Sequence, residues 1–308
     1  MIEVAGLTKK YGDLLAVKDL SFKVDKGKIW GLLGPNAAGK TTTMRILTGY
    51  LPASDGKAVV AGYDVFEQPN EVKRIIGYLP EVVPLYPEMT VGDYLKFVAE
   101  IKQVPASKRK AAVDKAVNAA ALESVRGRLI KNISKGFRQR VGIAQALIHD
   151  PQVLILDEPL IGLDPAQCKD IRDLIKSLRG EHTILLSTHI LAEITQTCDG
   201  ATIINEGTLM ASGTLDEIAA SVKVREGVVL KLRKGGEEAA AQMRRVTGVE
   251  KVGRTDKEYT VEWSKGQDPR EDLVRIAVDK GWGLLEMRSL AMNIEDLYLK
   301  IVSGGTAQ

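Results

Sequence analysis

Apolar and polar residues alternate at two places near the start of the chain, around residues 2–5 and 20–24, with Tyr11-Gly12-Asp13 between them. A period of two is typical of strands that have one buried face. The pattern therefore predicts a small antiparallel layer, joined by a turn at Tyr11-Gly12-Asp13, ahead of an unbroken apolar run at 29–33.

That run and two others, at 153–156 and 183–186, predict the strands of a second sheet. Helical spacing predicts helices at 42–47 and 166–179, and another from residue 134 to residue 149, where Pro151 stops it. Strands that alternate with helices in this way indicate a parallel sheet with helices on its faces.

A longer helical region covers residues 88–127. Its first part places a set of apolar residues on one predicted helix face: Met89, Val91, Tyr94, Leu95, Phe97, Val98 and Ile101. A second periodic run, rich in lysine and alanine, covers 107–125. We expect two helices here. The chain shows no internal repeat.

The pattern changes near residue 219. The predicted elements are strands at 227–233, 251–254, 259–264 and 284–289, and helices at 237–247, 269–280 and 294–302. Their order predicts a compact α+β domain of ferredoxin-like type. We therefore expect one domain at 1–220 and a small α+β domain at 221–308, which ends in a frayed tail at 304–308.

Bulk composition narrows the function only slightly. The 308 residues are 44% hydrophobic and 27% charged, and the net charge of +3 is too small to favour nucleic acid as a partner. No apolar stretch approaches the length needed to cross a bilayer, and the N-terminus lacks the apolar segment of a signal peptide. Two cysteines, Cys168 and Cys198, without metal-ligand spacing favour a reducing cytoplasm.

The clearest motif is Gly34-Pro35-Asn36-Ala37-Ala38-Gly39-Lys40-Thr41, which satisfies the P-loop pattern G-x-x-x-x-G-K-[ST]. It lies between a predicted strand and a predicted helix, as a P-loop requires. Backbone N–H groups of such a loop cradle phosphates, and the helix N-terminus adds its dipole. Lys40 is expected to reach the β- and γ-phosphates, and Thr41 to place its hydroxyl on Mg²⁺.

Two carboxylates end the apolar run at 153–156. Asp157 suits Mg²⁺ coordination beside a P-loop. Glu158, one residue on, is expected to point to the opposite side of the strand end and to be free to orient a water molecule. The simpler interpretation is that both acids are merely solvated, and the P-loop argues against it.

Ser134 is a natural N-cap for the helix at 134–149, and Gly136 is expected to leave backbone accessible. This segment is either a capped helix with a solvated basic face or a second anion site at a helix N-terminus. The residues alone leave the two interpretations open.

Together these motifs resemble the ATP-binding subunit of an ABC transporter over residues 1–220. Residues 34–42 resemble Walker A, 134–138 the signature motif, 153–158 Walker B and 162–165 the D-loop. His189 matches the switch histidine, and Tyr11, with Val17 beside it, matches the aromatic residue that stacks on adenine. The resemblance implies an α/β fold of the P-loop NTPase ABC type, with a mixed sheet, a helical subdomain and an antiparallel β layer.

The resemblance implies ATP and Mg²⁺ as cofactors. It assigns ATP hydrolysis to Glu158 and His189, and Mg²⁺ to Thr41, Asp157 and Glu81. It assigns ATP binding to Tyr11, Val17, Gly34, Pro35, Asn36, Ala37, Ala38, Gly39, Lys40, Thr41, Thr42, Glu81, Ser134, Lys135, Gly136, Phe137 and Asp164.

Five positions depart from the commonest family pattern. Lys135 and Arg138 replace a glycine and the glutamine of the signature, and Glu81 replaces the usual glutamine. Ala37 replaces a Walker A glycine, and Leu160 a threonine. The signature variant and the closing segment at 293–302 resemble the subgroup that serves ABC-2 type permeases, which are drug, polysaccharide or gliding-motility-associated exporters.

The family implies two subunits, identical or closely related, that close head to tail around ATP, which favours a γ-phosphate site at Ser134. It also implies a separate ABC-2 type permease, reached through a groove near residues 87–97, and a location in the cytoplasm on the inner face of the cell membrane. A soluble ABC ATPase without a transport role is the alternative, but it normally has two tandem ABC domains or a long coiled coil. A small-molecule kinase would not need the signature, and Glu158 argues against a regulator with little turnover.

Overall fold

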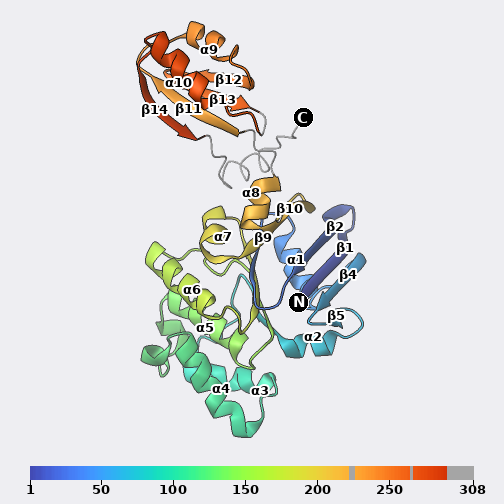
Figure 1. Ribbon diagram of the computed structural model, residues 1–308. Coiled ribbons are helices and arrows are strands. Elements are labelled where there is room, and N and C mark those ends of the chain that lie inside the picture. Colours follow the sequence, from blue (N-terminus) through green and yellow to red (C-terminus); the bar gives the residue numbers. More distant parts are fainter. Residues whose placement is uncertain (222–225, 264–265, 290–308) are drawn as a thin grey trace. The chain divides into compact units, whose positions relative to one another are not determined.

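The computed structural model of the protein describes residues 1–221, 226–263 and 266–289 (Figure 1). The chain forms two compact units that divide between Leu215 and Asp216. Each unit has its own hydrophobic core. The domain limits of 1–220 and 221–308 stay a prediction.

The first unit begins with a four-stranded antiparallel sheet in the order β2-β1-β4-β5. Its strands are β1 (Ile2–Tyr11), β2 (Leu14–Val24), β4 (Asp55–Val60) and β5 (Tyr63–Asp64). Buried and exposed residues alternate along the second half of β2, as expected of a strand with one buried face. The predicted antiparallel layer is confirmed.

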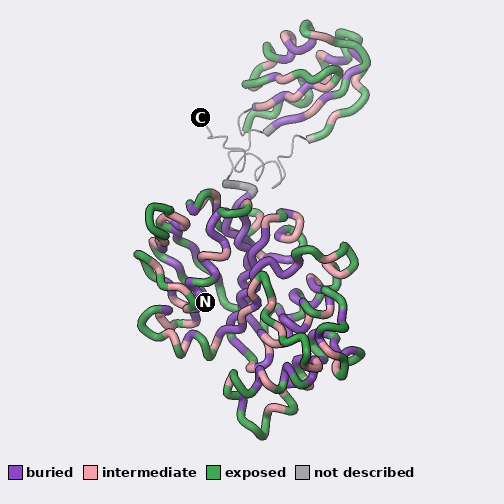
Figure 2. The backbone as a smooth tube through the Cα atoms, turned by 180° about the vertical axis from the view of Figure 1, so that it is seen from behind, coloured by how far each residue is buried: buried purple, intermediate pink, exposed green. Residues whose placement is uncertain are grey.

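A six-stranded sheet follows, in the order β10-β9-β3-β8-β7-β6. Its strands are β3 (Ile29–Leu33), β6 (Ile76–Leu79), β7 (Val153–Leu156), β8 (Thr183–Thr188), β9 (Gly200–Asn205) and β10 (Thr208–Thr214). Every pairing is parallel except that of β9 with β10. All residues of β3, β7 and β8 are buried, and Figure 2 shows this buried centre. The predicted parallel sheet is confirmed, although the sequence pattern missed β6, β9 and β10.

Eight α-helices lie between residues 40 and 221. They are α1 (Lys40–Leu47), α2 (Pro69–Ile75), α3 (Val91–Ile101), α4 (Ala106–Ala119), α5 (Lys135–Leu147), α6 (Pro165–Ser177), α7 (Leu191–Thr197) and α8 (Leu215–Ser221). The helices α3, α4 and α5 contact one another and form a helical group. Across the residues that the structure describes, no helix is both long and apolar enough to cross a bilayer.

The predicted helical region at 88–127 is confirmed with three corrections. Met89 precedes the helix, because Thr90 caps α3 by accepting a hydrogen bond from the Asp93 N–H. Ile101 is 59% exposed and does not belong to the buried face, since it lies in the last turn. The second helix ends at Ala119, ahead of Ala121 with its positive φ, and only a short 3-10 turn at Glu123–Val125 follows.

The second unit contains β11 (Glu226–Leu232), α9 (Glu237–Met243), β12 (Val249–Thr255), β13 (Glu258–Trp263), α10 (Arg270–Asp279) and β14 (Leu284–Ser289). Its antiparallel sheet has the order β12-β13-β11-β14. This is the predicted ferredoxin-like arrangement. Helix α9 ends before residue 247, ahead of Gly248 with its positive φ. The helix predicted at 294–302 and the tail at 304–308 lie outside the described residues.

Candidate active site

The P-loop connects β3 to α1, as predicted. Gly39, directly before α1, has a φ of +98°, and a Cβ there would lie 2.6 Å from the Ala16 carbonyl oxygen. Ala37 has a φ of +65°, so this residue adopts the left-handed conformation that glycine occupies without strain. The loop therefore keeps the P-loop conformation at a local cost.

Lys40 lies within the curve of this loop. Its side chain is 6% exposed, and Nζ donates hydrogen bonds to the carbonyl oxygens of Gly34 (2.8 Å) and Pro35 (3.1 Å). It also lies 3.4 Å from Oε1 of Glu158. The Lys40 ammonium thus lies inside the P-loop, where phosphate is expected to bind.

Asp157 stands at the tip of β7, buried beside the start of α1. Its Oδ1 accepts hydrogen bonds from the hydroxyls of Ser187 (2.6 Å) and Thr41 (3.4 Å). Burial raises the pKa of this carboxyl, and the hydrogen bonds partly oppose that shift. Its Oδ2 is buried and has no hydrogen-bond partner among the described residues. A buried carboxylate oxygen without a donor is suited to a cation.

Glu158 corrects one prediction. We expected its side chain to point away from Asp157 and to be free, but Glu158 has a φ of +48°, which breaks the alternation of the strand. Its carboxylate lies beside Lys40 and 3.1 Å from Nδ1 of His189. Both acids therefore contact P-loop residues, and the Glu158 carboxylate lies between Lys40 and His189 and contacts both.

Of the two residues predicted to contact adenine, Tyr11 is exposed and Val17 is buried. Tyr11, the last residue of β1, is 43% exposed, and Nζ of Lys9 lies 5.3 Å from its ring centroid. Val17 is 1% exposed and pairs with Lys9 rather than Tyr11. It packs under Gly39 of the P-loop, because it belongs to the buried face of β2, and its role beside Tyr11 at the adenine stays a prediction.

The signature segment opens α5. Ser134 is the predicted N-cap, and its Oγ accepts a hydrogen bond from the Phe137 N–H at 3.3 Å. Gly136 is buried rather than accessible, because the side chain of Gln167 covers it. The Lys135 ammonium lies over Gly162, where any Cβ would overlap it. The signature segment therefore packs against residues 162–167.

Asp164 and Glu81 flank these elements. Asp164 caps α6, and its Oδ1 accepts a hydrogen bond from the Gln167 N–H at 2.9 Å. Glu81 is exposed, two residues after the end of β6. The Leu79 carbonyl oxygen accepts a hydrogen bond from the Asp157 N–H at 2.8 Å, so this strand end lies next to the strand that carries the acids.

Sequence reasoning missed Ser187 and Gln139. Ser187 is fully buried; its hydroxyl donates to Asp157 and accepts a hydrogen bond from the Glu158 N–H at 2.9 Å. Gln139 is 6% exposed and donates to the Pro159 carbonyl oxygen at 2.9 Å, which ties α5 to the loop after Glu158. Two features of the sequence could have indicated them. Ser187 is a polar residue within an apolar strand, and Gln139 lies on the helix that begins with the signature.

Comparison with known proteins identifies this arrangement. The family model of the ABC transporter matches residues 17–161. Bacitracin transport ATP-binding protein BcrA of Bacillus licheniformis is 34% identical over 310 residues, which cover 99% of this chain and 98% of BcrA. Probable multidrug ABC transporter ATP-binding protein YbhF of Escherichia coli is 34% identical over 71% of this chain but only 38% of YbhF.

Solved structures agree. An ATP-binding subunit of an ABC transporter is 31% identical, with a TM-score of 0.65, and the match covers 72% of this chain and 92% of that subunit. The ATP-binding cassette MJ0796, in a dimeric post-hydrolysis state bound to ADP and Pi, has a TM-score of 0.63 over 70% of this chain and 99% of its own. At 22% identity, that likeness shows the fold alone. Because BcrA matches over almost its whole length, the chain belongs to the family of ABC transporter ATP-binding proteins, ATPases that hydrolyse ATP to power transport.

Proposed function

We propose that this chain energises an exporter built on an ABC-2 type permease, with its ATP site formed by residues 34–42 and completed by a second ATPase subunit. The observation that carries the catalytic part is the contact of Glu158 with both Lys40 and His189. Support for the exporter comes from BcrA and YbhF, whose names specify bacitracin and multidrug transport and one of which matches this chain end to end.

The residues at the tip of β7 fit Mg²⁺. This ion is usually held by one or two carboxylates together with substrate phosphates and water. Asp157 offers a buried oxygen without a donor, and Thr41 Oγ1 lies 3.4 Å from its other oxygen. Among the described residues no group of three His, Cys, Asp or Glu side chains is arranged for a metal, which agrees with an ion that depends on phosphate. Thr41 and Asp157 would hold Mg²⁺, and Glu81 is the third proposed Mg²⁺ residue. The bound ion would neutralise negative charge on the phosphates.

Glu158 is the proposed general base. In the free protein its carboxylate is paired with Lys40. The phosphates of ATP attract the Lys40 ammonium more strongly, because they carry more charge, and this releases Glu158 to accept the proton of the attacking water. His189 keeps Glu158 oriented at 3.1 Å and contacts the γ-phosphate. Tyr11 stacks on adenine through its exposed ring.

The second subunit supplies the signature. Ser134 is an exposed N-cap at the start of a 13-residue helix, which suits an anion. In the proposed dimer, Ser134, Lys135 and Phe137 face the γ-phosphate of the partner, and Asp164 lies beside them. Gly136 contributes by admitting Gln167 close to the helix start. The partner is a second copy or a closely related ATPase.

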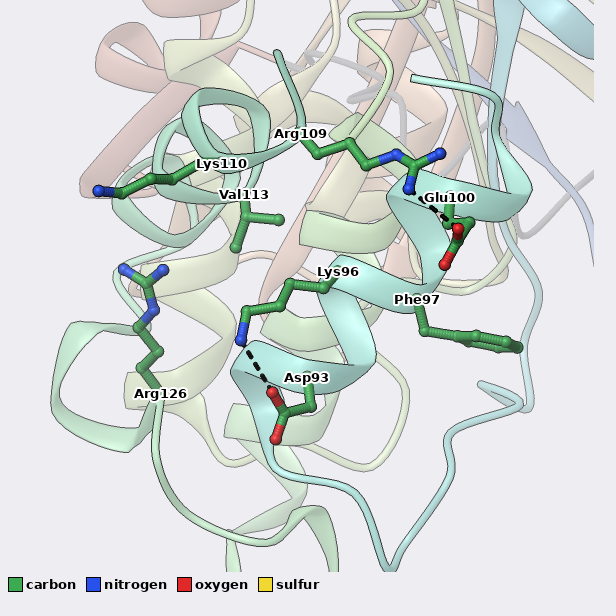
Figure 3. Close-up of a pocket in the computed structure, with 8 residues that line it drawn as sticks. All are labelled: Asp93, Lys96, Phe97, Glu100, Arg109, Lys110, Val113 and Arg126. Carbon is green, nitrogen blue, oxygen red and sulfur yellow. Dashed lines mark hydrogen bonds and ion pairs between the residues drawn. The ribbon is translucent and has the colours of Figure 1, made fainter. Parts of the chain in front are cut away.

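The permease is proposed to dock beside α3. A hollow of about 590 Å³ lies between α3 and α4, with Phe97 and Val113 among its lining residues. Figure 3 shows the side chains that line it. Two of its cations are paired within it, Lys96 with Asp93 and Arg109 with Glu100, each at 2.9 Å. A cytoplasmic segment of the permease with an apolar face and an acidic edge fits this surface. The ATPase would then lie on the inner face of the membrane.

Glu158→Gln tests this function. It keeps the shape of the side chain but removes the base, so the rate of hydrolysis should fall on the order of 10²–10⁴-fold while ATP still binds. Sedimentation of this variant should show a dimer with ATP and a monomer without it. Adding Ser134→Arg should abolish the dimer, whereas Ser107→Arg, at an exposed position of α4, should not.

A monomer in both conditions, even with the permease present, would contradict the head-to-tail site. Recovery of an integral membrane partner by pull-down of the full chain tests the transport role separately. Docking beside α3 predicts that Lys110→Glu weakens this recovery, since it places an acid on the proposed surface, and that Lys169→Glu on α6 does not.

A further inference from the structure

A second hollow lies at the far end of α1 from the P-loop. Its volume is about 350 Å³, and Thr48, Gly49, Tyr50, Lys73, Ile76, Tyr78 and Lys102 line it. These residues come from the end of α1, from α2 and β6, and from the residue after α3. The hollow therefore lies where the catalytic core meets the helical group, and the nucleotide site described above does not include it.

The polar side chains that line the hollow are two lysines, two tyrosines and one threonine. None of the seven lining residues is acidic. Lys73 and Lys102 form no ion pair with any carboxylate that the structure describes, although many surface lysines of this chain do. Arg45 adds a third positive charge close by, since its guanidinium carbon lies 5.9 Å from the ring centroid of Tyr50.

The Lys102 ammonium is the strongest indication of an anionic ligand. Lys102 is partly buried, and burial lowers the pKa of its ammonium without an offset from any carboxylate. Among the described residues, its ammonium donates one hydrogen bond, to the Ile76 carbonyl oxygen at 3.4 Å, and that oxygen also meets Nε2 of His149 at 3.0 Å. An ammonium has three donors. A partly buried ammonium that pairs with no carboxylate of the described residues is suited to an anionic ligand.

The two tyrosines favour a ligand larger than a simple ion. Tyr78 lines the hollow with a phenol, which is protonated at neutral pH and can donate a hydrogen bond. Tyr50 is 76% exposed, and its ring is available for contact with an organic body. The hollow falls at the lower end of the usual size of small-molecule sites.

We propose that this hollow, which we name the α1-end pocket, binds a small molecule that carries a phosphate group. Lys73 and Lys102 hold the phosphate, the Tyr78 hydroxyl donates to it, and Tyr50 covers the remainder of the ligand. A phosphate is favoured over a carboxylate because two lysines and a tyrosine hydroxyl line one hollow, which matches a dianion with several acceptor oxygens. The ligand would connect α1, whose first residue is Lys40, to the end of α3.

Equilibrium dialysis tests the site with inorganic phosphate, phenyl phosphate and acetate as probes. The background is Lys40→Met, which weakens anion binding at the P-loop. Both phosphates should bind saturably, with phenyl phosphate tighter. Lys73→Met and Lys102→Met should each weaken binding about tenfold, the loss expected for one charge-assisted hydrogen bond. Lys169→Met, an exposed lysine on α6, should have no effect.

Three results would overturn the proposal. The first is the absence of saturable binding of both phosphates. The second is binding that neither Lys73→Met nor Lys102→Met weakens, which would locate it elsewhere. The third is equally tight binding of acetate, which would remove the assignment to phosphate. Lys73 is exposed, so its variant keeps the test valid if Lys102→Met unfolds the protein.

Discussion

Single residues set the local geometry of the nucleotide site, and Ala37 shows this most directly. Its φ of +65° costs an L-residue about 1–2 kcal/mol. We predict that Ala37→Gly raises the free energy of unfolding by about 1 kcal/mol, since glycine relieves this strain but loses more entropy on folding. The ATPase rate should change only modestly, because the loop already has the required shape.

Ala38→Gly is the matched control. Ala38 is 2% exposed and has no positive φ, so glycine there removes a buried methyl group and should lower stability by about 1 kcal/mol. Urea unfolding of both variants measures the pair. A large gain in ATPase rate for Ala37→Gly would show instead that Ala37 limits turnover.

The residues also show how far sequence reasoning reaches. Thr41 and Asp157 lie within 3.4 Å of each other, because a P-loop and a strand tip in one parallel sheet have fixed relations. The turn at Glu158 could not be predicted. It depends on a positive φ in a non-glycine residue and on a hydrogen bond from its N–H to Ser187, which lies 29 positions away. The burial of Val17 could not be predicted for a similar reason, since only the pairing of β1 with β2 decides which side chains are buried.

Among the elements, α5 and β6 are held in unusually close contact. A Cβ on Gly77 of β6 would overlap the Ala146 carbonyl oxygen of α5. We predict that Gly77→Ala lowers the free energy of unfolding by about 3 kcal/mol, because the backbone cannot yield as a side chain would. Since α5 carries Ser134 at its start, ATPase activity should fall as well. Gly127→Ala is the control, as nothing lies within 4 Å of its Cβ, and it should be neutral.

The end of α5 predicts a pH dependence. His149 follows α5, and burial, with the charge of Lys102, lowers the pKa of its imidazole from 6.5 to about 4, against weaker opposing effects of Ile76 and Asp150. The folded protein therefore resists protonation of His149. Stability is unaffected above the unfolded pKa of 6.5 and is lost as the pH falls from 6.5 to about 4, on the order of 2–3 kcal/mol.

His149→Gln removes this titration and keeps a donor for the Ile76 carbonyl oxygen. The difference in unfolding free energy between the variant and the wild type should shift in favour of the variant as the pH falls below 6.5, and should be constant above pH 7. Parallel curves from pH 8 to pH 4 would show that His149 is protonated as easily in the folded protein as in the unfolded one.

Element prediction succeeded where periodicity was strong and failed where segments were short or mixed. The runs that became β3, β7 and β8 were unbroken and fully buried. β6 is as short as β7, but Gly77 and Tyr78 interrupt its apolar run, and β10 alternates between exposed and intermediate positions without a buried face. In β6, Gly77 has no side chain to add to the pattern, although its packing against α5 needs that absence.

At the scale of the whole molecule, the two units have separate cores and separate chemistry. The core of the second unit gathers Tyr259, Trp263, Leu273 and Trp282 around its own sheet. Every residue of the candidate active site belongs to the first unit. We therefore expect the second unit to be dispensable for nucleotide binding, with dimer contact or regulation as its proposed role.

Tryptophan fluorescence tests this division, because Trp30 lies in the first core and Trp263 and Trp282 in the second. A chain truncated after Ala220 should bind ATP with unchanged Kd and retain the unfolding transition reported by Trp30. In the full chain, a hundredfold excess of ATP over Kd should stabilise that transition by about 2.7 kcal/mol and leave the transition reported by Trp263 and Trp282 unshifted. Trp30→Phe isolates the signal of the second unit, and the double variant Trp263→Phe/Trp282→Phe isolates that of Trp30. A single transition that ATP shifts as a whole, or loss of ATP affinity in a truncated chain that is still folded, would show that the units depend on each other.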